Sequence, residues 1–342
     1  MARHDRLIRN RAIAEKFYEG YHGSVERGHL SLVFDPDDFA DQWVFCSPFL
    51  GGESSHGKSR DLAEGAVLNH SIISARVPDY KMDDFRAWPT EAGCAWRWRV
   101  NGHGLDGELV EFWEQLFLWI DDEGLITRFE FYDDWHGFAQ GLIYAYDTTL
   151  DAFSGIAGYG ASPWTSGGTM ALTTPGTPPR EDPPATDRSA GNLALAQRCF
   201  DAYRSSPDAS WLDAVHDDLT EECVLFSPWT GEQSIASGQQ DTVAIGHPKI
   251  RERFPDLRVK KFEAWPTDDG CAWRWGLEGT GAGGVRYELW QQVFIDTDPS
   301  GKVTRVESYF DWQGFPQMIG YVTGIPLDEL WDSSSYEAWL TA

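Results

Sequence analysis

The sequence predicts an α+β protein of two tandem domains, in each of which an antiparallel sheet packs on helices. A stretch near residues 77–135 recurs near 255–312 without a gap: Trp88 recurs as Trp265 and Asp134 as Asp311, both 177 positions later. So long a period indicates a duplicated domain rather than a solenoid. In each copy the helix patterns come first and the strand patterns follow in a run, which favours α+β over alternating βαβ units.

The order of elements is the same in both copies. Apolar residues at helical spacing predict helices, aromatic and β-branched runs predict strands, and prolines end the second helix and the first strand. In the first copy the expected helices are 8–22 and 60–76, and the expected strands are 43–49, 85–89, 94–100, 111–120 and 125–135. The second copy repeats this pattern from a helix at 193–203 to a strand that ends at Trp312.

The domain boundaries follow from composition. Residues 147–192 are rich in Gly, Ser, Thr and Pro, and they separate a first domain, 1–146, from a second domain, 193–342. The second domain is expected to end in a short helix at 326–342. The length of the segment 147–192 is compatible with a lid over a pocket, or with an ordered strap that has no such role.

The composition excludes several classes of partner. A net charge of −26 argues against nucleic acid and anionic membranes, because binding to phosphate relies on Lys and Arg. No apolar stretch is long enough to span a bilayer, and the charged start of the chain lacks the apolar core of a secretory signal. Five scattered cysteines indicate reduced thiols. We therefore expect a cytoplasmic protein that binds neither nucleic acid nor membrane.

An ordered set of short motifs occurs in both copies. The first copy contains Ser47-Pro48, Pro78-Asp79, Trp96-Arg97-Trp98, Gly102-His103-Gly104, Gly124-Leu125-Ile126 and Tyr132-Asp133-Asp134. The second copy contains Ser227-Pro228, Pro255-Asp256, Trp273-Arg274-Trp275, Gly279-Thr280-Gly281, Gly301-Lys302-Val303 and Tyr309-Phe310-Asp311. This set resembles the NTF2-like superfamily, and within it the SnoaL-like branch of polyketide cyclases, which lies near the ketosteroid isomerases, scytalone dehydratases and limonene epoxide hydrolases.

The resemblance implies two cone-shaped domains, each a curved antiparallel sheet wrapped around helices with a pocket inside. Members of the superfamily commonly pair through their sheets. The resemblance therefore also implies that the two halves form an internal pseudo-dimer, and it leaves a further homo-oligomer open. It is poor evidence for the reaction, because this fold hosts many functions.

The acids that end the last strand of each copy are the first catalytic candidates. Side chains alternate along a strand, so Glu130, Tyr132 and Asp134 share one face. The second copy repeats this arrangement with Tyr309 and Asp311. On a concave face lined with aromatic rings, desolvation raises the pKa of a carboxyl group toward that of a general acid or base. The resemblance implies a catalytic carboxylate at this place, whereas the alternative is that these acids cap a turn or pair with an arginine.

His103 is the other catalytic candidate. It matches the histidine of a Gly-Thr-His-Gly motif in the family that the chain resembles, and Thr280 stands at its place in the second copy. Histidine moves protons near neutral pH, and a single active site needs it only once. The alternative is an exposed histidine in a turn. The first half is expected to be the more active one, because it alone has His103, Tyr18 and the additional acid Asp133.

Six further residues are candidates for substrate binding: Tyr18, Tyr21, Phe45, His70, Trp113 and Gln115. Packing in the core is the alternative for the aromatic residues, and a position at a helix end is the alternative for His70. A buried Gln115 would need a hydrogen-bond partner, which a substrate could provide.

Two signals for cofactors are rejected. Gly102, Gly104 and Gly107 match a dinucleotide-binding fingerprint, but a strand pattern follows them where that fingerprint needs a helix, so we interpret them as turn glycines. No group of His, Cys and carboxylates has the spacing of a metal site. We therefore expect an enzyme that needs neither a metal nor another cofactor.

The expected function is an acid/base lyase, of the deformylation, retro-aldol or dehydration type, acting on a hydrophobic aromatic small molecule. A further resemblance, to the tandem bacterial lyases that deformylate lignin-derived diarylpropanoids, implies a diaryl substrate. An enzyme of the polyketide-cyclase or isomerase type and a non-catalytic module that binds a small molecule are the alternatives.

Overall fold

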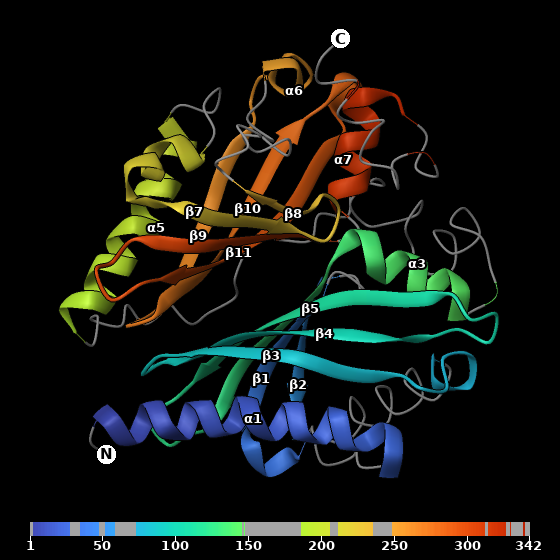
Figure 1. Ribbon diagram of the computed structural model, residues 1–342, viewed down its shortest axis with the longest axis vertical. Coiled ribbons are helices and arrows are strands. Elements are labelled where there is room, and N and C mark those ends of the chain that lie inside the picture. Colours follow the sequence, from blue (N-terminus) through green and yellow to red (C-terminus); the bar gives the residue numbers. More distant parts are fainter. Residues whose placement is uncertain are drawn as a thin grey trace. The chain divides into compact units, whose positions relative to one another are not determined.

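The computed structural model describes residues 3–27, 35–47, 52–58, 73–145, 147, 186–205, 211–234, 248–311, 314–325, 329 and 338. The chain divides into two compact units, Met1–Tyr159 and Gly160–Ala342 (Figure 1). Each unit contains helices and one six-stranded sheet in the described part of the chain. The predicted α+β fold class with two tandem domains is therefore confirmed.

The first unit contains α1 (Arg3–Arg27), η2 (Pro36–Asp38), β1 (Phe39–Ser47), β2 (Gly52–Gly57), β3 (Lys81–Pro89), β4 (Gly93–His103), β5 (Leu109–Ile120), β6 (Ile126–Asp133) and α3 (Trp135–Ala145). Its strands lie in the order β2-β1-β6-β5-β4-β3. All neighbours are antiparallel except β1 and β6, which run parallel, so the prediction of a purely antiparallel sheet was wrong for this pair. Of the second predicted helix, only residues 73–76 lie in the described part, and they are helical.

The second unit repeats this arrangement. It contains α5 (Asp187–Ser205), η4 (Trp211–Asp218), β7 (Leu219–Ser227), β8 (Gly231–Ser234), α6 (Pro248–Arg253), β9 (Arg258–Thr267), β10 (Gly270–Thr280), η6 (Ala282–Gly284), β11 (Arg286–Thr297), β12 (Val303–Phe310) and α7 (Gly314–Thr323). The strand order is β8-β7-β12-β11-β10-β9, with β7 and β12 parallel. Apart from residues 329 and 338, the predicted C-terminal helix at 326–342 lies outside the described residues.

Helix α5 begins inside the segment that composition assigned to a linker. Thr186 and Ser189 cap it reciprocally: the Ser189 N–H donates to Thr186 Oγ1 at 3.1 Å, and the Thr186 N–H donates to Ser189 Oγ at 2.9 Å. Such a reciprocal cap satisfies N–H groups that a helix start leaves without partners. The predicted second domain therefore starts several residues too late at 193, while 148–185 lie outside the described residues.

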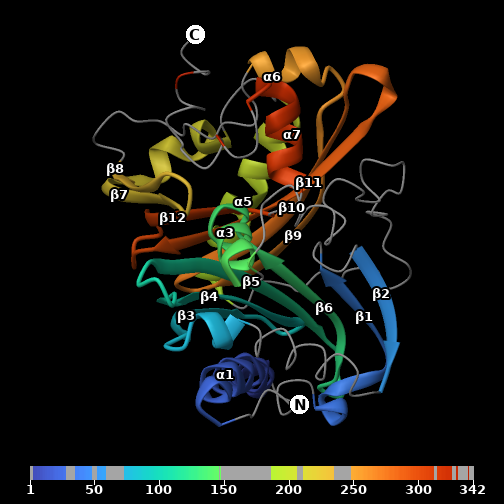
Figure 2. The same ribbon diagram turned by 90° about the vertical axis from the view of Figure 1, so that its right-hand side faces the viewer.

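The long first helix of each unit packs on one face of its sheet. In the first unit the Phe17 ring on α1 lies 5.6 Å from that of Trp96 on β4 and 5.5 Å from that of Phe129 on β6. The strands curve around the side on which α1 lies (Figure 2), and we call this side the concave face. In the second unit, Tyr203 of α5 contacts Trp275 of β10 in the same way, at 5.6 Å.

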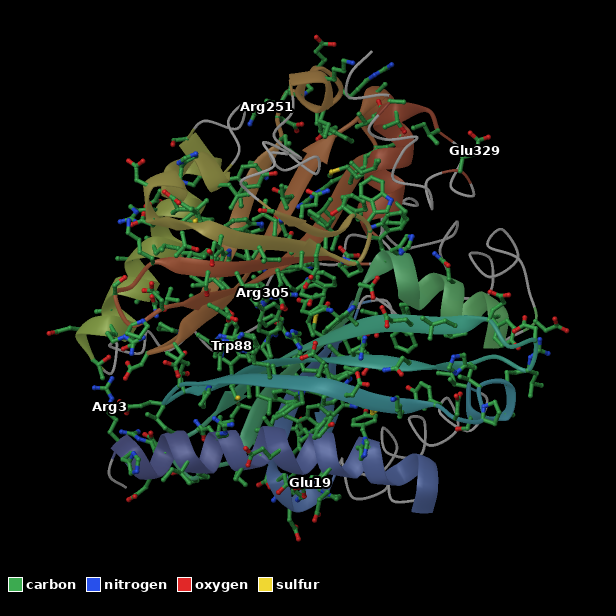
Figure 3. The ribbon with its side chains drawn as sticks, viewed as in Figure 1. Arg3, Glu19, Trp88, Arg251, Arg305 and Glu329 are labelled. Atoms are coloured by element: carbon green, nitrogen blue, oxygen red, sulfur yellow. The ribbon has the colours of Figure 1, made fainter. Side chains whose placement is uncertain are left out.

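The helix is also anchored to the turn between β3 and β4. Asn10 is fully buried and its amide donates to the Thr90 carbonyl at 2.8 Å. Arg3, at the start of α1 (Figure 3), forms an ion pair with Glu91 at 2.5 Å. Asn192 of α5 makes the equivalent hydrogen bond to the Thr267 carbonyl, also at 2.8 Å. Both units thus use a buried Asn to set the helix against the sheet.

The Trp-Arg-Trp motif supports a bulge in the neighbouring strand. Asp84 in β3 has φ +49°, and the pairing of β3 with β4 shifts there. The buried Arg97 donates to the Asp84 carbonyl, and its guanidinium lies 4.7 Å from the Trp113 ring centroid. The second unit repeats this with Lys261 and Arg274. A bulge bends and twists a strand, so the arginine stabilises the curvature of the sheet while both tryptophans fill the core.

Two other expectations are confirmed. Gly107 lies in the turn between β4 and β5 with φ +86°, and a strand follows it, so the glycines belong to a turn and not to a dinucleotide site. All five cysteines are buried, and none forms a disulfide. Among the described residues, no helix is both long and apolar enough to cross a bilayer.

Asp134 and Asp311 cap helices α3 and α7. The Asp134 carboxylate accepts the Trp113 N–H at 2.5 Å and the Gly137 N–H at 2.7 Å. Asp311 accepts the corresponding N–H groups of Trp290 and Gly314, each at 2.6 Å. A Cβ atom at Gly137 would lie 2.1 Å from the Glu111 carbonyl oxygen, so glycine is needed where the helix passes β5.

We expect Asp134→Ala and Asp311→Ala each to lower the free energy of unfolding by about 2 kcal/mol, because each removes a cap and leaves a buried N–H of the preceding strand without its acceptor. Denaturation in urea would measure the change. Glu123→Ala, at an exposed turn position, is the control. Unfolding curves of the two variants that match the control would contradict the capping role.

Candidate active site on the concave face of the first sheet

Two acidic side chains lie opposite each other on the concave face of the first sheet. Glu114 of β5 pairs with Asp133 of β6, and Glu114 also pairs with Trp98 of β4. The Trp98 ring packs on Tyr21 of α1 at 5.3 Å, which identifies the face on which all three side chains lie. Directly opposite residues have Cβ atoms about 5 Å apart, so the two carboxyl groups are close neighbours. Glu114 is 3% exposed and Asp133 is 1% exposed.

The two carboxyl groups have different hydrogen-bond partners. The Trp98 indole Nε1–H donates to Glu114 Oε2. Neither oxygen of Asp133 has a hydrogen-bond partner among the described residues. Buried polar atoms are nearly always hydrogen-bonded, so an unpartnered buried carboxyl group requires an explanation. Asp133 is therefore a buried acid to which the described residues donate no hydrogen bond.

Electrostatics favour the protonated forms of both groups. Burial raises the pKa of Glu114 to about 8, against the lowering effect of the Trp98 hydrogen bond. Burial, and then the charges of Glu114 and Asp134, raise the pKa of Asp133 well above its usual value. Each acid disfavours ionisation of the other, so both keep their protons to a higher pH than an exposed carboxyl group does.

Two phenols accompany the acid pair. Burial raises the pKa of Tyr21 on α1 and of Tyr80, which precedes β3, well above 10, and the charges of Glu114 and Asp133 raise both further. Both phenols therefore remain protonated and can donate hydrogen bonds. Acid, base and phenol donors are the equipment that proton transfer on a small molecule requires.

The second unit carries neutral or apolar residues at the equivalent positions. Gln291 stands where Glu114 stands, Phe310 where Asp133 stands, and Leu257 where Tyr80 stands. The Trp275 Nε1–H donates to Gln291 Oε1 at 2.7 Å, and the Gln291 amide donates to Ser308 Oγ at 2.9 Å. The concave face of the second unit thus carries a neutral, hydrogen-bonded network at this place.

These differences locate residues that the sequence analysis missed. Glu114 and Tyr80 were not among the candidates, Trp98 appeared only within the Trp-Arg-Trp motif, and Asp133 was noted only as an additional acid. The available signal was the charge that one copy has and the other lacks, at Glu114 and Gln291 and at Asp133 and Phe310. Retention in both copies does not point to these residues.

The predicted position of Glu130 and Tyr132 on the concave face was wrong. On β6 it is Phe129 that packs on α1, so by alternation Glu130 and Tyr132 lie on the opposite face. There the Tyr132 hydroxyl donates to Glu130 Oε2 at 2.9 Å, and Tyr309 donates to Glu307 in the same way. Alternation predicted which side chains share a face, but the docking of α1 decides which face is concave.

Asp134 and Asp311 are buried, as predicted, but both of their carboxylate oxygens accept backbone N–H groups. Burial raises the pKa of Asp134 to about 7, although the hydrogen bonds from Gly137 and Trp113 lower it. The predicted direction of the shift is therefore right for Asp134. The geometry is that of the capping alternative, and a catalytic role for either acid stays a prediction.

The predicted binding residues divide between the two faces. Tyr21 and Phe45 lie on the concave face, where the Phe45 ring is 5.4 Å from that of Phe129. Trp113 and Gln115 are buried on the opposite face, which was not expected of binding residues. The half-buried Tyr18 stacks on Phe85 at 4.7 Å and donates to the Met82 carbonyl at 3.3 Å. His70 lies outside the described residues.

His103 lies at the exposed end of β4, where 61% of its side chain is accessible. Its Nδ1 contacts Asp79 Oδ2 at 2.8 Å, and its backbone N–H donates to Asp79 Oδ1. Hydrogen bonds from His103 lower the pKa of Asp79. In the second unit the Thr280 N–H donates to Asp256 Oδ1 at 2.7 Å. The Pro-Asp motif thus holds the end of this strand in both units, and His and Thr occupy the same structural position.

Among the described residues, no cluster of three or more His, Cys, Asp or Glu side chains could hold a metal ion.

No protein-family model matches the chain, and no curated protein matches it. Similar solved structures include AclR, a candidate hydroxylase from Streptomyces galilaeus (19% identity, TM-score 0.31), a candidate SnoaL-like polyketide cyclase from Jannaschia sp. CCS1 (15%, 0.31) and an NTF2-like protein of unknown function from Exiguobacterium sp. 255-15 (19%, 0.27). In the same order, the matched regions span 40%, 41% and 36% of this chain, and 99%, 97% and 98% of the chains of the three similar proteins. The chain is thus similar to NTF2-like and SnoaL-like structures, and similarity at this level carries no argument about activity.

His103→Thr, which copies the second unit, is expected to change the free energy of unfolding by less than about 0.5 kcal/mol, whereas Asp79→Ala should lower it by about 1 kcal/mol. Urea denaturation of both variants checks this. If His103 also transfers protons, His103→Thr would lose activity with an unchanged unfolding curve. Equal destabilisation by the two variants would contradict the equivalence of His103 and Thr280.

The acid pair is expected to make stability depend on pH. Folding raises the pKa of both groups, so between the ordinary carboxyl pKa near 4 and about 8 the folded chain holds protons that the unfolded chain has released. Stability therefore falls as the pH rises through this range. Asp133→Asn should raise Tm more at pH 8 than at pH 5. The difference between the two gains should be about 3 °C, which corresponds to about 1 kcal/mol in the free energy of unfolding.

Thermal denaturation at the two pH values measures this effect. Glu123→Gln, which removes an exposed acid, is the matched control and should give equal shifts at both pH values. A gain from Asp133→Asn that is independent of pH would show that Asp133 is ionised in the folded protein.

Proposed function

We propose that the protein is a cofactor-independent enzyme that transfers protons on a small hydrophobic, aromatic molecule at the concave face of the first unit. The observation that carries the proposal is the pair Glu114 and Asp133, two buried acids among aromatic rings that the second unit replaces with Gln291 and Phe310. Since the same fold forms with a neutral pair, the acids are not a requirement of folding.

The hydrogen bonds divide the roles within the pair. A donor favours the ionised form of a carboxyl group, so Glu114, which accepts the Trp98 N–H, is the general base. Asp133 has no donor among the described residues, so it keeps its proton and is the general acid. Tyr21 and Tyr80 would donate hydrogen bonds to an oxygen on which negative charge develops.

This arrangement supports elimination and carbon–carbon cleavage next to an oxygen. Glu114 would remove a proton from carbon or from a hydroxyl group, and Asp133 would protonate the departing oxygen in a dehydration, or the carbanion carbon in a retro-aldol deformylation. A diaryl compound, as in the lignin-derived series, would suit the rings of Tyr21 and Trp98. Enolisation in an isomerase or cyclase uses the same groups, so an enzyme of that type is the alternative within this proposal.

The second unit favours a different role. Its Trp275, Gln291 and Ser308 can form hydrogen bonds but cannot transfer protons near neutral pH. We propose that it binds a ligand or supports the first unit without catalysis. A first domain at 1–146, internal pairing of the two units and a cytoplasmic location belong to the same proposal.

Glu114→Gln and Asp133→Asn are each expected to lower turnover by about a hundredfold or more, because a residue that acts as acid or base contributes at least that much. A screen of the purified protein, without added cofactor, against aromatic alcohols and β-hydroxy carbonyl compounds provides the substrate. Ser308→Ala in the second unit is the control and should retain full turnover. Unchanged rates in both acid variants would refute the proposal.

A further inference from the structure

We propose that Trp98 is a positioning residue that decides which acid of the pair is ionised, so that Glu114 is the carboxylate and Asp133 holds the proton. The inference rests on the proposed function for its catalytic meaning, because it assigns base and acid within that site. Its physical content, an ordered loss of protons, holds with or without a substrate.

The comparison of the two units isolates the role of the tryptophan. Both units keep an indole donor at this place, Trp98 and Trp275, and both direct it at the side chain on the neighbouring strand. In the second unit that acceptor is the neutral Gln291, whose amide is oriented further by Ser308. Phe131 stands where Ser308 stands, so the first unit offers no hydroxyl there.

An indole N–H can only donate. A donor stabilises a carboxylate more than a neutral carboxyl group, because the hydrogen bond to a charged acceptor is about twice as strong. Trp98 therefore favours the ionised form of Glu114 and donates no hydrogen bond to Asp133. Both acids are buried to nearly the same extent, so the hydrogen bond from Trp98 distinguishes Glu114 from Asp133.

The surroundings do not reverse this order. The titratable groups that act on the pair are Tyr21 from α1, Tyr80 before β3 and Asp134 at the end of β6. The phenols stay neutral, and Asp134 disfavours ionisation of both acids. Two adjacent buried charges of the same sign are strongly unfavourable, so the first acid to ionise keeps the second protonated.

The test follows the indole N–H resonances of the protein by NMR from pH 5 to 9, without substrate. The resonance of Trp98, assigned by its loss in Trp98→Phe, should shift with a midpoint near pH 8, where Glu114 is expected to titrate. Asp133→Asn should leave this midpoint nearly unchanged, because Asp133 is protonated and neutral while Glu114 ionises. The resonance of Trp275, which contacts a neutral amide, should not titrate, and it is an internal control.

Two variants decide the role of Trp98. Glu114→Gln should abolish the response of Trp98 to pH, and the second unit shows that the fold accepts Gln at this place. In Trp98→Phe, the midpoint of 13C-labelled Glu114 should rise by about one pH unit, which packing alone would not cause. If Trp98→Phe does not fold, the Trp98 resonance in the wild type, Asp133→Asn and Glu114→Gln still decides the outcome.

A Trp98 resonance that does not change between pH 5 and 9, or a Glu114 midpoint unchanged in Trp98→Phe, would overturn the inference. The two proposals fail separately. If Trp98 titrates as expected but Glu114→Gln keeps full turnover, the positioning role stands and the proposed function is wrong. If Glu114→Gln loses turnover while Trp98 does not titrate, the acid pair is catalytic and Trp98 does not order it.

Discussion

The carboxylate of Asp134 makes the contacts on which the candidate site depends. One of its oxygens accepts the Trp113 N–H on β5 and the other accepts the Gly137 N–H on α3, so one side chain joins the last two strands to the following helix. Glu114 and Asp133, the next residues along these strands, are thereby held opposite each other. Because a slip of one residue would turn a side chain to the other face, this register is a condition for the acid pair.

The residues that both copies retain explain the fold. Asp134, Arg97 and Asp79 each bind backbone groups at a place where the chain bends or a strand ends, and each has a counterpart in the second unit with the same partners. These motifs allowed the fold to be predicted from the sequence. They do not by themselves identify a catalytic residue, because a residue that every copy of a fold needs is retained whether or not the copy is catalytic. The candidate chemistry lies where the copies differ in charge.

The remaining differences between sequence and structure have physical causes. The polar strands β2 and β8 have no apolar alternation because they lie at the edges of their sheets, where one side has no neighbouring strand. Helix α3 follows β6 directly, since Asp134 ends the strand and caps the helix. The face that α1 covers depends on contacts distant in sequence, such as Phe17 with Trp96 and Phe129, and no pattern within a single strand reports them.

The cost of the acid pair argues that it is functional. Two adjacent buried carboxyl groups lower stability at neutral pH, and neutral or apolar residues of similar size would remove that cost. The second unit contains such a solution, with Gln291 and Ser308 hydrogen-bonded and Phe310 in the core. A duplicated chain therefore shows, on one fold, what the site looks like with and without its acids. Because proteins are only marginally stable, packing does not explain why two buried acids that lower the free energy of unfolding are retained. Proton transfer is the use that the geometry of Glu114, Asp133 and Trp98 supports.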